Sequence, residues 1–345
     1  MSHLQCNSFM QSRQFSIFGA CMLMLIQSIS CQNTSNPMNQ ETKLNPLLCD
    51  PKQGTCEIPG GAAQTDVETK EVATEKPVKV LYFTDPICSS CWGIEPQLRR
   101  MKMEYGDYID VEYCMGGLLP SWDGFNGGGI SKPADVYHHW EEVSHHYEMP
   151  MIGDVWLNDP LPSSYPPSIA FKAAQMQDKT KALAFLRRLR EMVFVEAKNI
   201  TRPELIAEAA VWAGLDAAQL EKDSKGPALQ LFEQDLKRSR EMGVRGFPTV
   251  FFMDDSGNRL TVYGARSYEE FSGSIQRLAP GASAKALSTE VLVYFEPFKS
   301  LTSKELSLFM NKPVADCEAL LKQLEKEGRL QVITTKNGSL WRLKS

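Results

Sequence analysis

The sequence predicts an α/β protein in which a helical block interrupts a single sheet-containing unit and a small module follows. Strand-like VKVLYF leads into a helical pattern, and strand patterns return only at FPTVFFM and NRLTVYG, before a helix at Tyr268–Leu278. The small-residue stretch PGASAKALS separates the last segment. We therefore expect one α/β unit over 78–279, with a helical insertion at about 130–242, a linker at 280–288 and a C-terminal domain at 289–345.

The composition is that of a globular protein with a slightly acidic surface. The chain has 345 residues, 43% hydrophobic residues and a formal net charge of −5, so it is long enough for two or three modules. The lack of a basic excess argues against nucleic acid and anionic membrane surfaces as partners. Its nine cysteines exceed what packing requires in a cytosolic protein of this size.

The first 31 residues are predicted to be an export signal. An apolar core from about Phe15 to Ile26 follows Arg13, and it is shorter than the roughly 20 residues that span a bilayer. The ending SISC resembles a bacterial lipobox, which makes Cys31 the candidate for lipidation. We expect an exported protein, either periplasmic or anchored facing the periplasm, whose only membrane contact is a lipid on Cys31.

Residues 32–77 are predicted to be a flexible tether, because they are polar, poor in aromatic residues and unable to bury a core. CDPKQGTC stands apart within this tether. Asp50–Pro51 and Gly54 favour a turn that brings Cys49 and Cys56 within disulfide distance. This accessory disulfide either braces the loop or relays electrons to Cys88.

The stretch FTDPICSSCW places Cys88 at the junction between the first strand and the next helix. A helix N-terminus favours a thiolate, so Cys88 is the predicted nucleophile. Cys91, one turn deeper, is the predicted resolving thiol. Metal binding and structural bracing are the alternatives, but a zinc site needs about four ligands and no second pair follows at the usual spacing.

Three neighbouring features have both a functional and a structural interpretation. Asp85 is expected to cap the helix, with proton movement at the thiols as the alternative. Cys114 lies in an apolar strand and is expected to be an inert core thiol. His138, Glu142 and His145 share one helical face in YHHWEEVSHHYEMP, which suits either a divalent cation or the border of a cleft. We predict no metal and no cofactor.

Two separated motifs carry a family resemblance. FTDPICSSCW and MGVRGFPTVFF, on either side of the helical block, resemble the DsbA family of thioredoxin-fold disulfide oxidoreductases. HHWEEV, DPLPSSYPPSIAFKAAQ and RGFPT are similar to the branch that contains FrnE and the YjbH-type adaptors. The resemblance implies a thioredoxin fold over 78–279 and a cis-proline at Pro248 facing the cysteines. A bend at Phe247–Pro248 would let an extended substrate pair as an added strand, with Phe247 and Trp92 as the expected substrate-binding residues.

The C-terminal domain resembles a winged helix-turn-helix. EVLVYF, LTSKELSLFMN, VADCEALLKQLEKEGRL and QVITTKNGSLWRL predict a strand or short helix, two helices, and a hairpin turning at Asn337–Gly338. The second helix, Val314–Leu330, mixes acidic with basic residues. We therefore expect protein docking or a structural role rather than DNA binding, and no role for Cys317.

These observations predict an exported thiol–disulfide oxidoreductase that acts on protein thiols and disulfides through Cys88 and Cys91 and is recycled by a redox partner protein. The alternative is a YjbH-like adaptor that binds a partner protein without redox turnover. A redox-responsive DNA regulator is disfavoured, because it requires a basic wing and residence in the cytoplasm.

Overall fold

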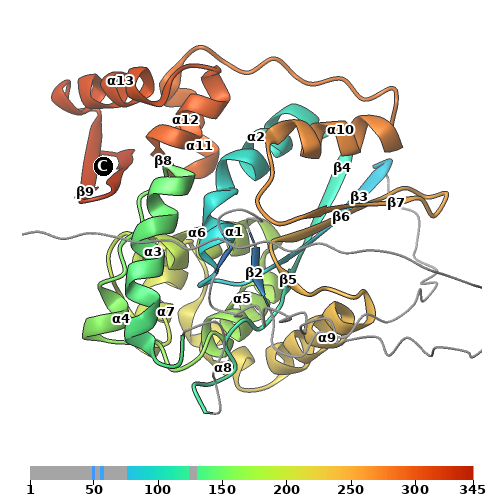
Figure 1. Ribbon diagram of the computed structural model, residues 1–345, viewed down its shortest axis with the longest axis vertical. Helices are drawn as coiled ribbons and strands as arrows, with labels where there is room; N and C mark the ends of the chain where they lie inside the picture. The colour runs from blue at the N-terminus through green and yellow to red at the C-terminus, as the bar shows by residue number, and fades with distance from the viewer. Residues whose placement is uncertain (1–48, 51–54, 58–75, 124–129, 345) are drawn as a thin grey trace, which may run out of the picture. The chain divides into compact units, whose positions relative to one another are not determined.

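The computed structural model describes residues 49–50, 55–57, 76–123 and 130–344 (Figure 1). The predicted signal peptide, Cys31 and most of the predicted tether lie outside the described residues. Within those ranges, none of the helices is long and apolar enough to cross a bilayer.

A four-stranded mixed sheet forms the centre of the α/β unit. Its strands are β3 (Val78–Thr84), β4 (Ile109–Met115), β6 (Thr249–Met253) and β7 (Arg259–Tyr263), in the order β4-β3-β6-β7. β3 runs parallel to β4 and antiparallel to β6. All but one residue of β3 are buried, as expected of a central strand that is covered on both faces.

Helices cover this sheet. α2 (Glu95–Tyr105) and α10 (Tyr268–Leu278) contact each other, and α10 also contacts β6 and β7. α9 contacts β4, and in Figure 1 it lies on the opposite side of the sheet from α2 and α10. The redox motif begins in the short helix α1 (Ser89–Gly93), which directly follows the end of β3.

The helical insertion predicted between the second and third strands is present. Its helices are α3 (Pro133–Tyr147), α4 (Val155–Asn158), α5 (Tyr165–Gln177), α6 (Lys179–Phe194), α7 (Pro203–Trp212), α8 (Ala217–Ser224) and α9 (Pro227–Glu241). Proline occupies the first turn of α3, α5, α7 and α9, where its missing N–H costs nothing. Asp178 caps α6 by accepting from the backbone N–H groups of Thr180 and Lys181.

A second, small sheet joins the tether to the α/β unit. It contains β1 (Cys49–Asp50), β2 (Thr55–Glu57) and β5 (Gly246–Phe247), in that order. Both pairings are antiparallel. The Phe247–Pro248 peptide bond that follows β5 is cis, as the family resemblance implied.

The C-terminal domain consists of a short helical entry, two helices and a three-stranded sheet. Its elements are η1 (Val291–Tyr294), α11 (Phe295–Phe298), β8 (Ser300–Thr302), α12 (Ser303–Met310), α13 (Val314–Lys326), β9 (Leu330–Thr335) and β10 (Gly338–Leu343). Thr335 pairs with Gly338, so the hairpin loop is Lys336–Asn337, one residue earlier than predicted. The helix–helix–hairpin order agrees with the prediction, whereas the winged-helix relationship stays a prediction.

Buried ion pairs fix this domain to the α/β unit. Glu305, in the first turn of α12, is fully buried. It accepts two hydrogen bonds from Arg187 of α6, at 2.9 and 3.1 Å, and lies 3.0 Å from Arg99 of α2. Arg342 of β10 reaches Glu191 of α6 at 2.6 Å. Buried charges are tolerated only when they are paired and hydrogen-bonded, so this arrangement commits α2, α6 and α12 to one relative placement.

Candidate active site

The two cysteines of the redox motif lie at the start of α1. Cys88 is the N-cap residue, and its Sγ accepts a hydrogen bond from the backbone N–H of Cys91 at 3.1 Å. The pair is in the dithiol form. The predicted placement of Cys88 at a helix start is therefore observed, and a backbone donor is already directed at its sulfur, which favours the thiolate.

Burial opposes ionisation at this site. Both cysteines are 0% exposed. Burial raises the pKa of the Cys88 thiol well above its usual value, and the neighbouring Cys91 raises it further. Burial also opposes the ionisation of Cys91, but the hydrogen bond from Cys88 and the charge of Arg190 outweigh it and lower the pKa of Cys91. In this closed arrangement the negative charge is better stabilised on Cys91, and solvent access to Cys88 would favour its ionisation.

Arg190 is a site residue that the sequence interpretation missed. Its fully buried guanidinium donates to Thr84 Oγ1 at 2.6 Å and forms an ion pair with Glu95. It therefore places a fixed positive charge behind Cys91. A signal was present in the sequence: with Leu186 and Val193, Arg190 lies on the buried side of α6 at helical spacing, where an apolar residue is the norm.

Asp85 does not cap α1, contrary to the prediction. Its carboxylate accepts from Ile87 N at 3.0 Å, from Leu118 N at 2.8 Å and from Ser164 Oγ at 2.8 Å. An aspartate that accepts from the N–H two residues later makes a local turn, so Cys88, rather than Asp85, holds the cap position. Asp85 instead ties the loop after β3 to the loop after β4 and to the start of α5.

Trp92 is a core residue, in disagreement with its predicted contact with substrate. It is 0% exposed, its indole N–H donates to Pro150 O at 3.0 Å, and its ring stacks on Phe194. The Arg187 guanidinium lies 4.3 Å from the ring centroid on Trp92. An indole with both its polar and its aromatic surfaces occupied braces α1 against the insertion.

Close packing on glycines holds α1 and β5 in place. A Cβ at Gly93 would lie 2.5 Å from the Tyr147 ring, whose hydroxyl shares a 2.8 Å hydrogen bond with Ser90 Oγ. A Cβ at Gly116 would lie 1.7 Å from the Phe247 ring. Phe247 is fully buried, so its side chain is committed to the core and only its backbone is available for strand pairing.

Cys114 lies in the core, whereas the histidine-rich face of α3 lies at the surface. Cys114 is fully buried and burial raises the pKa of its thiol, which agrees with a core role. His138, Glu142 and His145 are exposed along α3. Within the ranges that the structure describes, no group of three or more His, Cys, Asp or Glu residues is arranged to hold a metal ion.

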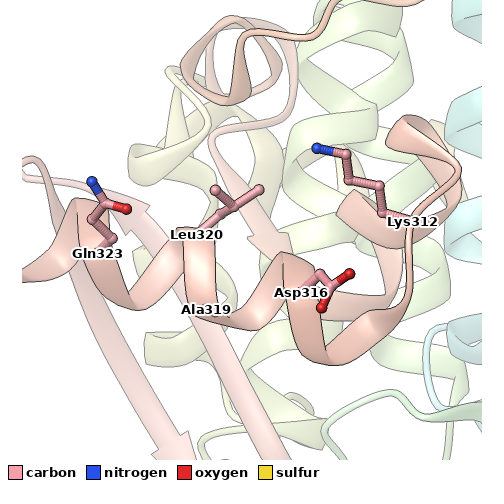
Figure 2. A pocket seen from close by; sticks show the side chains of 5 residues that line it. All are labelled: Lys312, Asp316, Ala319, Leu320 and Gln323. Atoms are coloured by element: carbon pink, nitrogen blue, oxygen red, sulfur yellow. The ribbon is translucent and has the colours of Figure 1, made fainter.

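A shallow pocket lies on the C-terminal domain, away from the redox motif. Figure 2 shows its lining side chains, which come from α13 and the residue pair before it. They are Lys312, Asp316, Ala319, Leu320 and Gln323. One cation and one carboxylate give the pocket a mixed charge, which agrees with the mixed composition predicted for this helix.

Comparisons with known proteins show which family and which relatives this chain resembles. The family model described as thioredoxin matches residues 81–273. A relative from Halalkalibacterium halodurans, named ClpXP adapter protein SpxH, is 29% identical over 304 residues, covering 86% of this chain and 97% of its own. The relative of the same name from Bacillus subtilis is 27% identical over 275 residues, covering 78% and 90%.

A solved structure from Nitrosomonas europaea, provisionally named a protein disulfide isomerase, shares the fold. It is 21% identical with a TM-score of 0.50, and the match covers 60% of this chain and 97% of that one. The family model spans more than half of the chain and includes both redox cysteines and the cis-proline. The chain therefore belongs to the thioredoxin family.

Proposed function

We propose that this protein exchanges disulfides with protein thiols, with Cys88 as nucleophile and Cys91 as resolving thiol. The observation that carries the proposal is the Cys88–Cys91 dithiol at a helix N-terminus, with a backbone N–H directed at Cys88 Sγ. The backbone N–H favours the Cys88 thiolate, from which exchange proceeds once solvent access relieves the burial of the sulfur. The positive charge of Arg190 stabilises the Cys91 thiolate while Cys88 is bonded to the partner in a mixed disulfide.

The reaction proceeds in two displacements that balance without a cofactor. The Cys88 thiolate attacks a disulfide sulfur of the partner, forming a mixed disulfide and releasing one partner thiolate. The Cys91 thiolate then attacks Cys88 Sγ, forming the Cys88–Cys91 disulfide and releasing the second partner thiolate. The partner gains two electrons and this protein loses two; starting from oxidised protein, the same steps run in reverse.

The test is turnover of a disulfide-bonded protein substrate, insulin, with a thiol reductant as electron donor. Cys88→Ser is expected to abolish catalysed reduction, and Cys91→Ser is expected to accumulate a mixed disulfide with the insulin chains. Cys317→Ala, a buried thiol of α13 far along the chain, is the matched control and should turn over normally. A Cys88→Ser variant as active as the parent would refute the proposal.

A second candidate function is that of a protein-binding adaptor. The relatives named ClpXP adapters match this chain over almost their entire length, and Cys88 is fully covered in the described arrangement. The double variant Cys88→Ser/Cys91→Ser separates the two functions. An adaptor without redox turnover would still bind its partner and deliver it to a protease, whereas an oxidoreductase would lose its activity.

Export with lipidation at Cys31 is part of the proposal, and it rests on the N-terminal sequence alone. Cell fractionation followed by mass spectrometry of the mature N-terminus tests it. A diacylated N-terminal Cys31 in the membrane fraction is expected, and a soluble protein that retains residues 1–30 would contradict it.

A further inference from the structure

The edge beside the redox motif is occupied by the protein's own chain. β2 pairs antiparallel with β5, and the register sets Cys56 opposite Phe247 and Glu57 opposite Gly246. Phe247 directly precedes Pro248, at the bend where an exchange partner was predicted to add as a strand. A segment of the tether therefore takes the place of that added strand.

The same segment lies against the helix that carries the cysteines. β2 contacts α1 as well as β5, and Figure 1 shows it beside both. Because Cys88 is the cap residue of α1, the contact between α1 and β2 places the backbone of the strand that contains Cys56 next to the redox helix. Among the described strands, β2 is the one that both pairs with β5 and contains a cysteine.

The hairpin also sets its own two cysteines opposite each other. β1 and β2 are antiparallel, with Cys49 in register with Cys56. Directly opposed residues in such ladders have Cα atoms about 4.5–5.5 Å apart, and disulfides form at Cα separations of about 4.4–6.8 Å. The backbone register is therefore compatible with a Cys49–Cys56 disulfide.

We propose that the β1–β2 hairpin is an internal exchange partner of the redox motif, with Cys56 as the sulfur that bonds to Cys88. This inference rests on the proposed disulfide-exchange function. It makes the hairpin a relay between the Cys88–Cys91 pair and outside disulfides, and it decides between the two roles that the sequence leaves open for Cys49 and Cys56.

The relay reaction conserves both atoms and electrons. The Cys88 thiolate attacks Cys56 Sγ of the Cys49–Cys56 disulfide, forming Cys88–Cys56 and releasing the Cys49 thiolate. The Cys91 thiolate then attacks Cys88 Sγ, forming Cys88–Cys91 and releasing the Cys56 thiolate. Two electrons pass from the redox motif to the hairpin, whose disulfide is supplied from outside by a low-molecular-weight disulfide such as glutathione disulfide.

The experiment traps the intermediate in the full-length chain. Cys91→Ser removes the resolving thiol, so oxidation with glutathione disulfide should leave a Cys88–Cys56 bond, found by alkylating free thiols and mapping peptides without reduction. Cys49 should be recovered alkylated or glutathionylated. Adding Cys56→Ser should abolish the internal cross-link, whereas adding Cys317→Ala should leave it intact.

The possible outcomes separate this inference from the proposed function. Glutathione on Cys88 together with an intact Cys49–Cys56 disulfide would overturn the relay and leave Cys88 exchange standing. A bond from Cys88 to Cys49 instead of Cys56 would overturn the proposal that Cys56 is the sulfur that bonds to Cys88. If Cys88 forms no mixed disulfide in Cys91→Ser, even when Cys49 and Cys56 are both changed to Ser, the proposed function fails with the relay.

Discussion

At the scale of single residues, Asp85 should make stability depend on pH in an unusual direction. Burial raises the pKa of its carboxyl to about 6, although hydrogen bonds from Leu118, Ile87 and Ser164 oppose the rise. A carboxyl whose folded pKa exceeds its unfolded pKa adds stability at low pH, and this contribution is lost as the pH rises from about 4 through about 6. About two pH units correspond to roughly 3 kcal/mol.

Asp85→Asn should remove this dependence. The unfolding free energy of the parent minus that of the variant should fall by about 3 kcal/mol between pH 4 and pH 7, as measured by urea denaturation at several pH values. Asp254→Asn is the control with opposite sign, because hydrogen bonds from Asn258 lower the pKa of that partly exposed carboxyl. Parallel curves for the parent and Asp85→Asn would contradict the assignment.

Arg190 should set the acidity of Cys91. Replacing Arg190 with Gln removes the positive charge that lowers the Cys91 pKa, so that pKa should rise, because a nearby opposite charge favours the ionised thiol. Ultraviolet thiolate absorbance of Cys88→Ser, with and without the Arg190 change, measures it. Arg188→Gln, two residues earlier and paired with Glu196 and Glu208, should leave the Cys91 pKa unchanged.

At the scale of elements, the sequence predicted those helices and strands whose periodic pattern of apolar residues lies within the element itself. Alternating apolar residues predicted β3, and helical spacing predicted the helices of the insertion, because each signal lies within the element itself. The cis bond at Pro248 came from the family resemblance, since a proline alone does not specify it. The strand-or-helix ambiguity at Val291–Tyr294 was resolved as helix by the fold.

Long-range partners account for what the sequence did not predict. The pairing of β2 with β5 joins residues nearly two hundred positions apart, and two- or three-residue strands carry no periodic signal. The burial of Trp92 depends on Phe194 and Pro150, which only the folded insertion supplies. The burial of Arg187 on α6 likewise depends on Glu305, which lies more than a hundred residues later in the chain.

The β9–β10 hairpin should depend on its turn for docking. Asn337 Nδ2 donates to Glu141 Oε2 at 2.7 Å and to Met151 O at 2.8 Å. Asn337→Ala removes both bonds and leaves a partly buried carbonyl unsatisfied, which should cost about 1–3 kcal/mol of unfolding free energy in a denaturant titration. Ser339→Ala, nearby in β10, should change it by less than about 0.5 kcal/mol.

The turn of the β9–β10 hairpin is held by contacts of Lys336 with α3, which affects whether Lys336 could bind a nucleic acid. Lys336 pairs with Glu141 at 3.0 Å and donates to Tyr137 Oη at 3.0 Å, so the basic residue of the hairpin's turn is already paired with residues of α3. A nucleic-acid phosphate would have to displace these contacts before Lys336 could bind it. The turn of the hairpin therefore links the C-terminal domain to α3, and the absence of a nucleic-acid partner stays a prediction.

At the scale of the whole molecule, the C-terminal domain and the α/β unit should unfold together, because charged groups that neither part could bury alone meet between them. Arg187 illustrates the coupling: its guanidinium lies over Trp92, next to Cys91, while donating to Glu305 of α12. Arg187 therefore contacts both the redox helix and the C-terminal domain.

Glu305→Gln tests this coupling. The amide keeps the shape of Glu305 and can still accept from Thr302 N in the capping box. It removes the buried charge that joins Arg187 and Arg99 to α12, although both arginines keep a second acidic partner within the α/β unit. Breaking one partner of a buried ion pair costs about 3–5 kcal/mol, so the denaturation midpoint should fall sharply and the change in Trp fluorescence should separate from the loss of helix.

Glu318→Gln is the matched control, since it removes an exposed pair with Lys322 in the same domain and should cost under about 1 kcal/mol. Equal, small losses from the two substitutions would mean that the domains are not joined through Glu305.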